Sequence, residues 1–188
     1  MHTFIIRDVR LKGYKPLGDV IEVDSSTPLQ WVIDSINRRG TDHGGDVKVI
    51  FMCHGLPGFL QCANGVTPHP QAGSGITAND LPTFAKIAGS VKRIEFYACL
   101  VARIGGCPEC NGMTGYDGNN FCYKMAQTTR AEVQASIHLQ YYFTGEVGFW
   151  IFKRPDGKGI NFGSWNGKVF TWGPGGNIIK TEDFPFTD

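Results

Sequence analysis

A nearly continuous apolar run, Val47–Cys53, limits most strongly the fold that this chain can adopt. A strand with one face in water alternates apolar and polar residues, whereas a strand covered on both faces is apolar throughout, as in a parallel sheet. Further strands are predicted at 91–97 and 132–139, and helices at 81–88 and 120–129. Strands and helices that alternate in this way form right-handed crossover units. The sequence therefore predicts an α/β fold with a mostly parallel central sheet flanked by helices.

Both ends of the chain are expected to extend this sheet. Two short strands joined by a turn are predicted within 1–23, followed by a helix that starts at Thr27 and ends at Gly40. From about 141 onward the pattern changes to aromatic-rich strands, which predict an antiparallel extension whose aromatic side chains pack across strands rather than line a carbohydrate or peptide groove. The prediction is one domain over 1–188, with its core at about 19–140 and the antiparallel strands at about 141–182.

Composition excludes several classes of protein. Hydrophobic residues make up 41% of the 188 residues and charged residues 19%, which is typical of a globular protein. The 18 Lys and Arg residues nearly balance the 17 Asp and Glu residues, so no nucleic-acid partner is indicated. No run of apolar residues is long enough to cross a membrane, and the first residues do not resemble a signal peptide. We therefore expect no membrane partner and, by default, a cytoplasmic location, with a non-classical secretion route left open.

Two predicted strands end in reactive residues, His54 and Cys99. Ligands of open α/β sheets bind at the carboxyl ends of the strands, and one helix separates these two strands, so we expect the two residues to lie close together. A thiolate can attack a carbonyl carbon while a histidine transfers protons, and the N–H groups of Gly55 and Cys99 can hold the oxyanion. The alternative is that His54 is a loop residue and Cys99 a small buried hydrophobe.

The segments His54–Gly58 and Ala98–Ala102 resemble motifs of the caspase-like cysteine peptidases, which include caspases, gingipains, legumains and separases. The greater similarity is to a bacterial caspase-like domain of unknown function, over roughly 47–137. The resemblance implies a three-layer fold and a peptide or protein substrate. It also implies Cys99 as the nucleophile, His54 as the general acid and base, and no metal or organic cofactor.

The chain lacks the Gln-Ala-Cys-Arg-Gly segment of the caspases proper, so the resemblance does not imply cleavage after Asp. Basic candidates for an acidic residue before the cut are Arg93 and Arg103, and acidic candidates for a basic residue are Glu109, Asp117 and Glu132. Self-cleavage in the long loops at 56–79 and 102–119 is a further hypothesis. A catalytically inactive scaffold or protein-binding module is the alternative function, and the oligomeric state stays open.

The five other cysteines and three of the histidines have their own interpretations. Cys107 and Cys110 form a Cys-x-x-Cys pair that can bind zinc with Cys122, form a disulfide or remain as free thiols. A fourth zinc ligand would come from one of three residues: His69, His138 or Cys62. Cys53 is expected in the core beneath His54, because neighbours in a strand point to opposite faces. His43 is expected in a turn at the opposite end of the first core strand.

Overall fold

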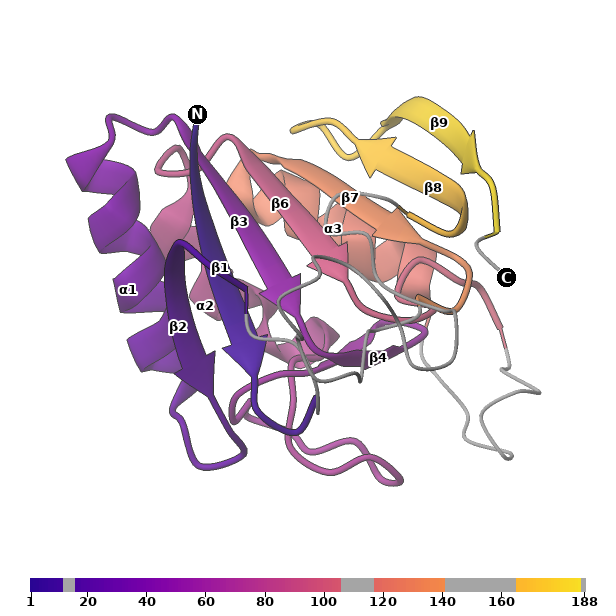
Figure 1. Ribbon diagram of the computed structural model, residues 1–188, viewed down its shortest axis with the longest axis horizontal. Coiled ribbons are helices and arrows are strands. Elements are labelled where there is room, and N and C mark those ends of the chain that lie inside the picture. Colours follow the sequence, from indigo (N-terminus) through magenta and orange to yellow (C-terminus); the bar gives the residue numbers. More distant parts are fainter. Residues whose placement is uncertain (12–15, 106–116, 141–164, 187–188) are drawn as a thin grey trace, which may run out of the picture.

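A computed structural model describes residues 1–11, 16–105, 117–140 and 165–186. These residues form a seven-stranded sheet in the order β2-β1-β3-β6-β7-β8-β9, with a separate β4–β5 hairpin (Figure 1). The strands are β1 (His2–Asp8), β2 (Asp19–Val23), β3 (Val47–Met52), β4 (His54–Leu56), β5 (Phe59–Gln61), β6 (Arg93–Tyr97), β7 (Glu132–Ser136), β8 (Gly167–Trp172) and β9 (Ile178–Phe184). The helices are α1 (Leu29–Asp42), α2 (Leu81–Phe84) and α3 (Gly118–Thr129), with 3₁₀ turns at Ala78–Asp80 and Ala85–Ile87.

The sheet is mixed but mostly parallel, as predicted. The five strands from β2 to β7 pair in parallel, while β8 and β9 pair antiparallel at one side. The aromatic-rich C-terminal part predicts three strands, at 143–153, 167–172 and 177–180, and the first of these lies outside the described residues. The second coincides with β8, and the third is longer than predicted, since β9 continues to Phe184. The α/β class and the antiparallel extension are therefore confirmed in the described part of the chain.

All three α-helices of the described residues cover one face of the sheet (Figure 1). The sequence predicted helices on both faces, and among the described residues the second face carries no helix. The chain moves in one direction across the sheet, from β2 to β3, then to β6 and β7. Right-handed crossovers that proceed in one direction place their helices on the same side of a sheet. The period of the hydrophobic pattern predicts which residues are buried, but not the direction in which the chain crosses the sheet.

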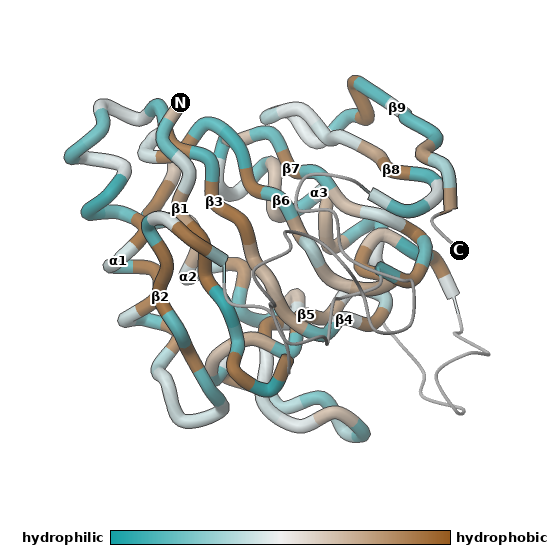
Figure 2. Tube along the Cα trace, in the orientation of Figure 1, coloured by the Kyte–Doolittle hydropathy of each residue, from teal (hydrophilic) through white to brown (hydrophobic). Residues whose placement is uncertain are grey.

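Aromatic side chains fill the core between the sheet and the helices. Phe51 on β3, which is largely apolar along its length (Figure 2), packs against Phe84 and Phe96 with ring centroids 6.2 and 5.8 Å apart. A smaller cluster on the other face includes Tyr97, whose ring stacks on Trp165 at 4.5 Å. These contacts agree with cross-strand and interlayer packing of the aromatic residues that the structure describes.

Several predicted boundaries need correction. The two N-terminal strands pair in parallel, although a connecting turn had been expected between them. Helix α1 begins at Leu29, and Pro28 takes the N-cap position that the sequence predicted for Thr27, whose hydroxyl instead accepts a hydrogen bond from the Asp24 N–H. The helix also continues past Gly40. A side chain at Gly40 would collide with Ser90, so this glycine permits close packing instead of ending the helix.

Burial of ionisable groups makes the fold sensitive to alkaline pH. Burial raises the pKa of Cys53 and Cys122 well above the ordinary thiol value, and it also raises the pKa of Cys99 and Tyr97. In the unfolded chain these groups ionise at about 8.5 for a thiol and about 10 for tyrosine. Above those values the unfolded chain releases protons that the folded chain retains, so the free energy of unfolding falls as pH rises.

We therefore expect a lower urea midpoint at about pH 10 than at about pH 7. The variant Cys122→Ala is expected to lose less stability over the same interval, because one of the four groups is gone. Equal midpoints of the wild-type chain at the two pH values would contradict the prediction.

Candidate active site

The register of the sheet brings His54 and Cys99 to the same level. β3 and β6 are parallel neighbours in which Met52 lies beside Tyr97, and the Cys53 N–H donates to the Tyr97 carbonyl at 3.4 Å. The offset of 45 residues in this pairing is the same as the separation between His54 and Cys99. The two residues therefore follow adjacent strands at the carboxyl edge of the sheet, as the sequence predicted.

Gly55 lies directly against the turn that holds Cys99. A Cβ at Gly55 would lie 2.5 Å from the Cys99 carbonyl oxygen and 2.9 Å from both the Ala98 Cβ and the Val101 Cγ2. The turn that joins β4 to β5 is bonded to the segment that follows Cys99, since the Gly58 N–H donates to the Val101 carbonyl at 3.0 Å. The β4–β5 hairpin, which carries His54, thus packs on the Cys99 turn through contacts that only glycine permits.

The main chain around Cys99 has an uncommon conformation and an N–H without an acceptor among the described residues. Leu100 has a left-handed φ of +60°, an uncommon conformation outside glycine that clusters at functional sites. In the described part of the chain the Cys99 N–H donates to no acceptor. Leu60 uses both its N–H and its carbonyl on Ile76, so the main-chain groups of Gly55 do not pair with Leu60 and point away from β5.

The half-buried Cys99 sulfur is held by hydrogen bonds in the resting structure. It donates to the Gln140 carbonyl and accepts from the Gln140 N–H, both at 3.3 Å. Cys99 also packs against an apolar cluster formed by Leu56, Phe59, Ala72, Leu100 and Leu139. Burial raises the pKa of the Cys99 thiol, and the Gln140 N–H offsets this only in part. The sulfur is therefore a protonated thiol at neutral pH in this state.

The His54 imidazole is exposed. Among the described residues it forms no hydrogen bond, and none joins it to the Cys99 sulfur. The main-chain segments that carry His54 and Cys99 pack against each other, but no hydrogen bond joins the two side chains. Catalytic hydrogen bonds are often long in structures without substrate, so this arrangement does not by itself separate an enzyme from a scaffold.

Gln140 holds the segment that covers Cys99, and no local sequence pattern predicted this role. Its side chain is 6% exposed and pairs with the main chain of Asn166. The amide oxygen accepts from the Asn166 N–H at 3.0 Å, and the amide nitrogen donates to the Asn166 carbonyl at 3.1 Å. These bonds fix the Gln140 main chain against the sulfur.

Replacing Gln140 with alanine is expected to speed alkylation of Cys99. Loss of the side-chain pair frees the covering segment, and a net hydrogen bond of about 1.4 kcal/mol corresponds to about a tenfold faster reaction. Iodoacetamide labelling near neutral pH, followed by peptide mass spectrometry, measures the rate. Gln127→Ala serves as the matched control. Gln127 also donates to a main-chain carbonyl, that of Gly175, but it lies on the exposed face of α3. An unchanged Cys99 rate in Gln140→Ala would show that Gln140 does not shield the thiol.

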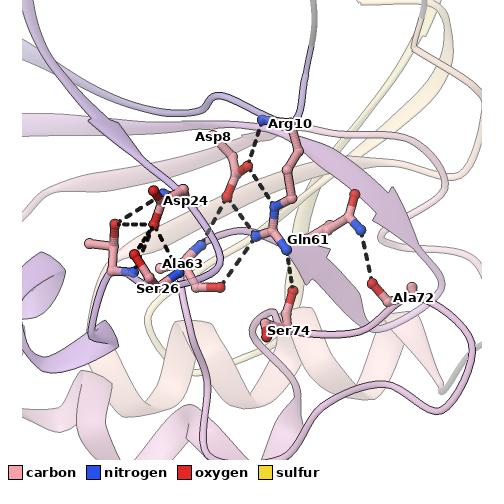
Figure 3. Close-up of polar contacts among 9 residues, drawn as sticks. Asp8, Arg10, Asp24, Ser26, Gln61, Ala63, Ala72 and Ser74 are labelled. Carbon is pink, nitrogen blue, oxygen red and sulfur yellow. Dashed lines mark hydrogen bonds and ion pairs between the residues drawn. The ribbon is translucent and has the colours of Figure 1, made fainter.

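A buried ion pair fixes the neighbouring loop at the carboxyl end of β1 (Figure 3). Asp8 is fully buried, and Arg10 binds it through Nε at 2.8 Å and Nη2 at 2.6 Å. Asp8 also accepts the Ala63 N–H at 3.1 Å, and Arg10 donates to the Ser74 carbonyl at 2.8 Å. The pair therefore joins both ends of the segment 63–74 to β1. Two charged residues after an apolar strand were the available signal in the sequence.

The structure separates the candidates for substrate specificity. Arg93 and Glu132 are the first residues of β6 and β7 and bond to each other at 2.9 Å. They lie at the amino edge of the sheet, opposite His54 and Cys99, so they are wrong as specificity residues. Asp117 caps α3 by accepting from the Asn120 N–H at 2.9 Å, while Glu109 lies outside the described residues. Arg103, next to the Cys99 turn, stays a prediction.

The zinc hypothesis concerns residues that the structure describes only in part. Cys107 and Cys110 lie outside the described residues, and Cys122 is buried in the core. Within the described ranges no three His, Cys, Asp or Glu side chains are grouped to hold a metal ion.

His43 stacks on His2 with ring centroids 3.9 Å apart, at the amino end of the sheet. This location agrees with its predicted place in a turn.

Comparison with known proteins adds no assignment: the chain matches no family model, no curated protein and no solved structure. No helix in the described part of the chain combines the length and the apolar character needed to cross a membrane.

Proposed function

We propose that this chain is a caspase-like cysteine endopeptidase with Cys99 as nucleophile and His54 as general acid and base. The observation that carries the proposal is the β3–β6 register, which sets these two residues side by side at the carboxyl edge of a parallel sheet. The close packing of Gly55 on the Cys99 turn supports it, because this contact holds the segment that carries His54 against the segment that carries Cys99.

In the proposed reaction the Cys99 thiol transfers its proton to His54, and the sulfur attacks the carbonyl carbon of the scissile peptide. The N–H groups of Gly55 and Cys99 bind the oxyanion of the tetrahedral intermediate. His54 then gives the proton to the departing amine, and an acyl-enzyme remains. Water hydrolyses this thioester with His54 as the base, which restores the thiol.

The resting thiol must first leave its contact with Gln140. Burial raises the pKa of the Cys99 thiol and the thiol donates to the Gln140 carbonyl, and both favour the neutral form. A substrate main chain offers the same N–H and carbonyl groups that Gln140 provides, so substrate binding can replace this contact. Activation of the sulfur is then confined to the complex with substrate.

A catalytically inactive scaffold is the alternative, and one observation favours it. The Cys99 sulfur is packed among apolar side chains, and no hydrogen bond joins it to His54. In this alternative the fold and the hairpin are retained, while the edge of the sheet binds another protein without chemistry.

A peptide library distinguishes the two functions. The purified chain is incubated with a mixed library of unstructured peptides, and new termini are identified by mass spectrometry, with Cys99→Ala as the control. The proposal predicts a set of new termini with the wild-type chain that is missing with Cys99→Ala. Absence of cleavage by the wild-type chain, or equal cleavage by both, would favour the scaffold.

A further inference from the structure

Two buried cysteines face each other at the open end of the hairpin that carries His54. In the β4–β5 ladder His54 lies opposite Gln61 and Gly55 opposite Leu60, and Cys53 and Cys62 are the next residues beyond this end of the ladder. Both cysteines are fully buried and neither is in a disulfide, and their side chains form a hydrogen bond with each other.

The geometry of this pair suits a disulfide bond. The Cys53 N–H donates to Tyr97 and the Cys62 N–H to Leu60, so the two cysteines do not exchange main-chain hydrogen bonds. Residues opposed in this way in an antiparallel ladder have Cα atoms about 4.5 Å apart. A disulfide connects Cα atoms about 4.4–6.8 Å apart, so little backbone movement is required.

In the closed structure burial raises the pKa of Cys53 and disfavours its thiolate, and the charge of Arg10 opposes this only in part. The charge of the Arg10 guanidinium acts on both cysteines, and hydrogen bonds to Asp8 and to the Ser74 carbonyl hold the guanidinium in place. A fixed positive charge near a thiol stabilises the thiolate, which is the form that attacks a disulfide.

We propose that Cys53 and Cys62 are a redox pair that a small-molecule disulfide, such as oxidised glutathione, converts to an intramolecular disulfide. One cysteine thiolate attacks a sulfur of oxidised glutathione, and one molecule of reduced glutathione leaves. The second cysteine thiolate attacks the protein sulfur of this mixed disulfide, and the second reduced glutathione leaves. Two electrons pass from the cysteines to glutathione disulfide, and the two thiol protons are taken up by the two glutathione thiolates.

Oxidation would close a ring that contains both His54 and the Pro57–Gly58 turn. The bond would fix the register of His54 opposite Gln61 and reduce the freedom of the unfolded chain. Because both sulfurs are buried, the reaction proceeds only when the hairpin opens, and the oxidised form is expected to melt at a higher temperature than the reduced form. The proposal concerns the hairpin alone and holds for an enzyme or for a scaffold.

Peptide mapping tests the proposal directly on the full chain. The protein is incubated with oxidised glutathione, unfolded in the presence of iodoacetamide and digested with trypsin without reductant. No lysine or arginine lies between Val49 and Lys86, so one peptide, residues 49–86, carries both cysteines. This peptide is expected to lack both alkyl groups and to be two hydrogen atoms lighter than the dithiol, and a reductant should restore double alkylation. Cleavage after Phe59 or Leu60 should leave the two fragments linked.

Two controls assign the bond to the folded hairpin. Cys122, which is equally buried but has no opposed cysteine in the described ladders, should remain alkylated in the same digest. Cys62→Ala should show alkylated Cys53 and no change of melting temperature on oxidation; if this variant does not fold, the wild-type map alone decides. A 49–86 peptide that stays doubly alkylated, or a Cys53 or Cys62 linked to another cysteine, would overturn the proposal.

Discussion

Replacing Cys99 with alanine is expected to reduce kcat/KM for a cleaved peptide by at least about 10⁴-fold, because no other group can form the acyl-enzyme. The activity of this variant can be compared directly with that of the wild-type chain. The Cys99 side chain contacts the rim of the hairpin rather than the main core, so the variant should fold. Hydrolysis of a library-derived peptide is measured together with the melting temperature. Activity within tenfold of the wild-type value in a folded Cys99→Ala chain would exclude this nucleophile.

His54→Ala is expected to cause a comparable loss, and the double variant should lose no more than either single variant. Residues that act as one unit are strongly non-additive, since the second loss has nothing left to remove. His43→Ala is the matched control, because His43 lies at the amino end of the sheet, and it should retain wild-type activity. Independent, multiplicative losses in the double variant would contradict a Cys99–His54 unit.

The sequence predicted the location of the two residues because strand ends are encoded locally. The apolar run Val47–Cys53 marks one buried strand, and a single predicted helix before the next strand makes the two adjacent. Local pattern cannot specify the register of two strands more than forty residues apart, yet here the register sets His54 level with Cys99. The face that the helices cover was also beyond the sequence, because it depends on the direction in which the chain crosses the sheet.

Parts of the site depend on contacts that no local pattern contains. Gln140 bonds the Cys99 sulfur across 41 positions of the chain, and Asn166 anchors it from a further element. The β4–β5 hairpin, in contrast, had a local signal that was missed. Residues 56–79 were predicted as a loop, although the Pro57–Gly58 pair lies between short apolar segments, which is typical of a tight turn between strands.

The half-buried sulfur and the exposed imidazole together limit how the proposed enzyme can work. Burial and the Gln140 carbonyl favour the neutral thiol, so a resting thiolate–imidazolium pair is not expected. Proton transfer to His54 therefore has to accompany substrate binding. The site would then be unreactive toward small electrophiles and active toward an extended peptide, which is the reverse of a permanently activated cysteine.

Gly55→Ala is expected to reduce kcat/KM by about 100-fold, because a displacement of about 1 Å at the reacting groups has an effect of this size. The added methyl group would collide with the Cys99 carbonyl, Ala98 and Val101, so the hairpin with His54 must move away from the Cys99 turn. The cost in stability is that of overpacking, about 1–3 kcal/mol, which a folded domain tolerates.

Gly173→Ala is the matched control, since its methyl group would meet only the flexible Ile179 side chain closely, at 2.9 Å, and should leave activity unchanged. Peptide hydrolysis and melting temperature are measured for both variants. A folded Gly55→Ala chain with wild-type kcat/KM would show that the spacing between the His54 and Cys99 segments does not govern the reaction.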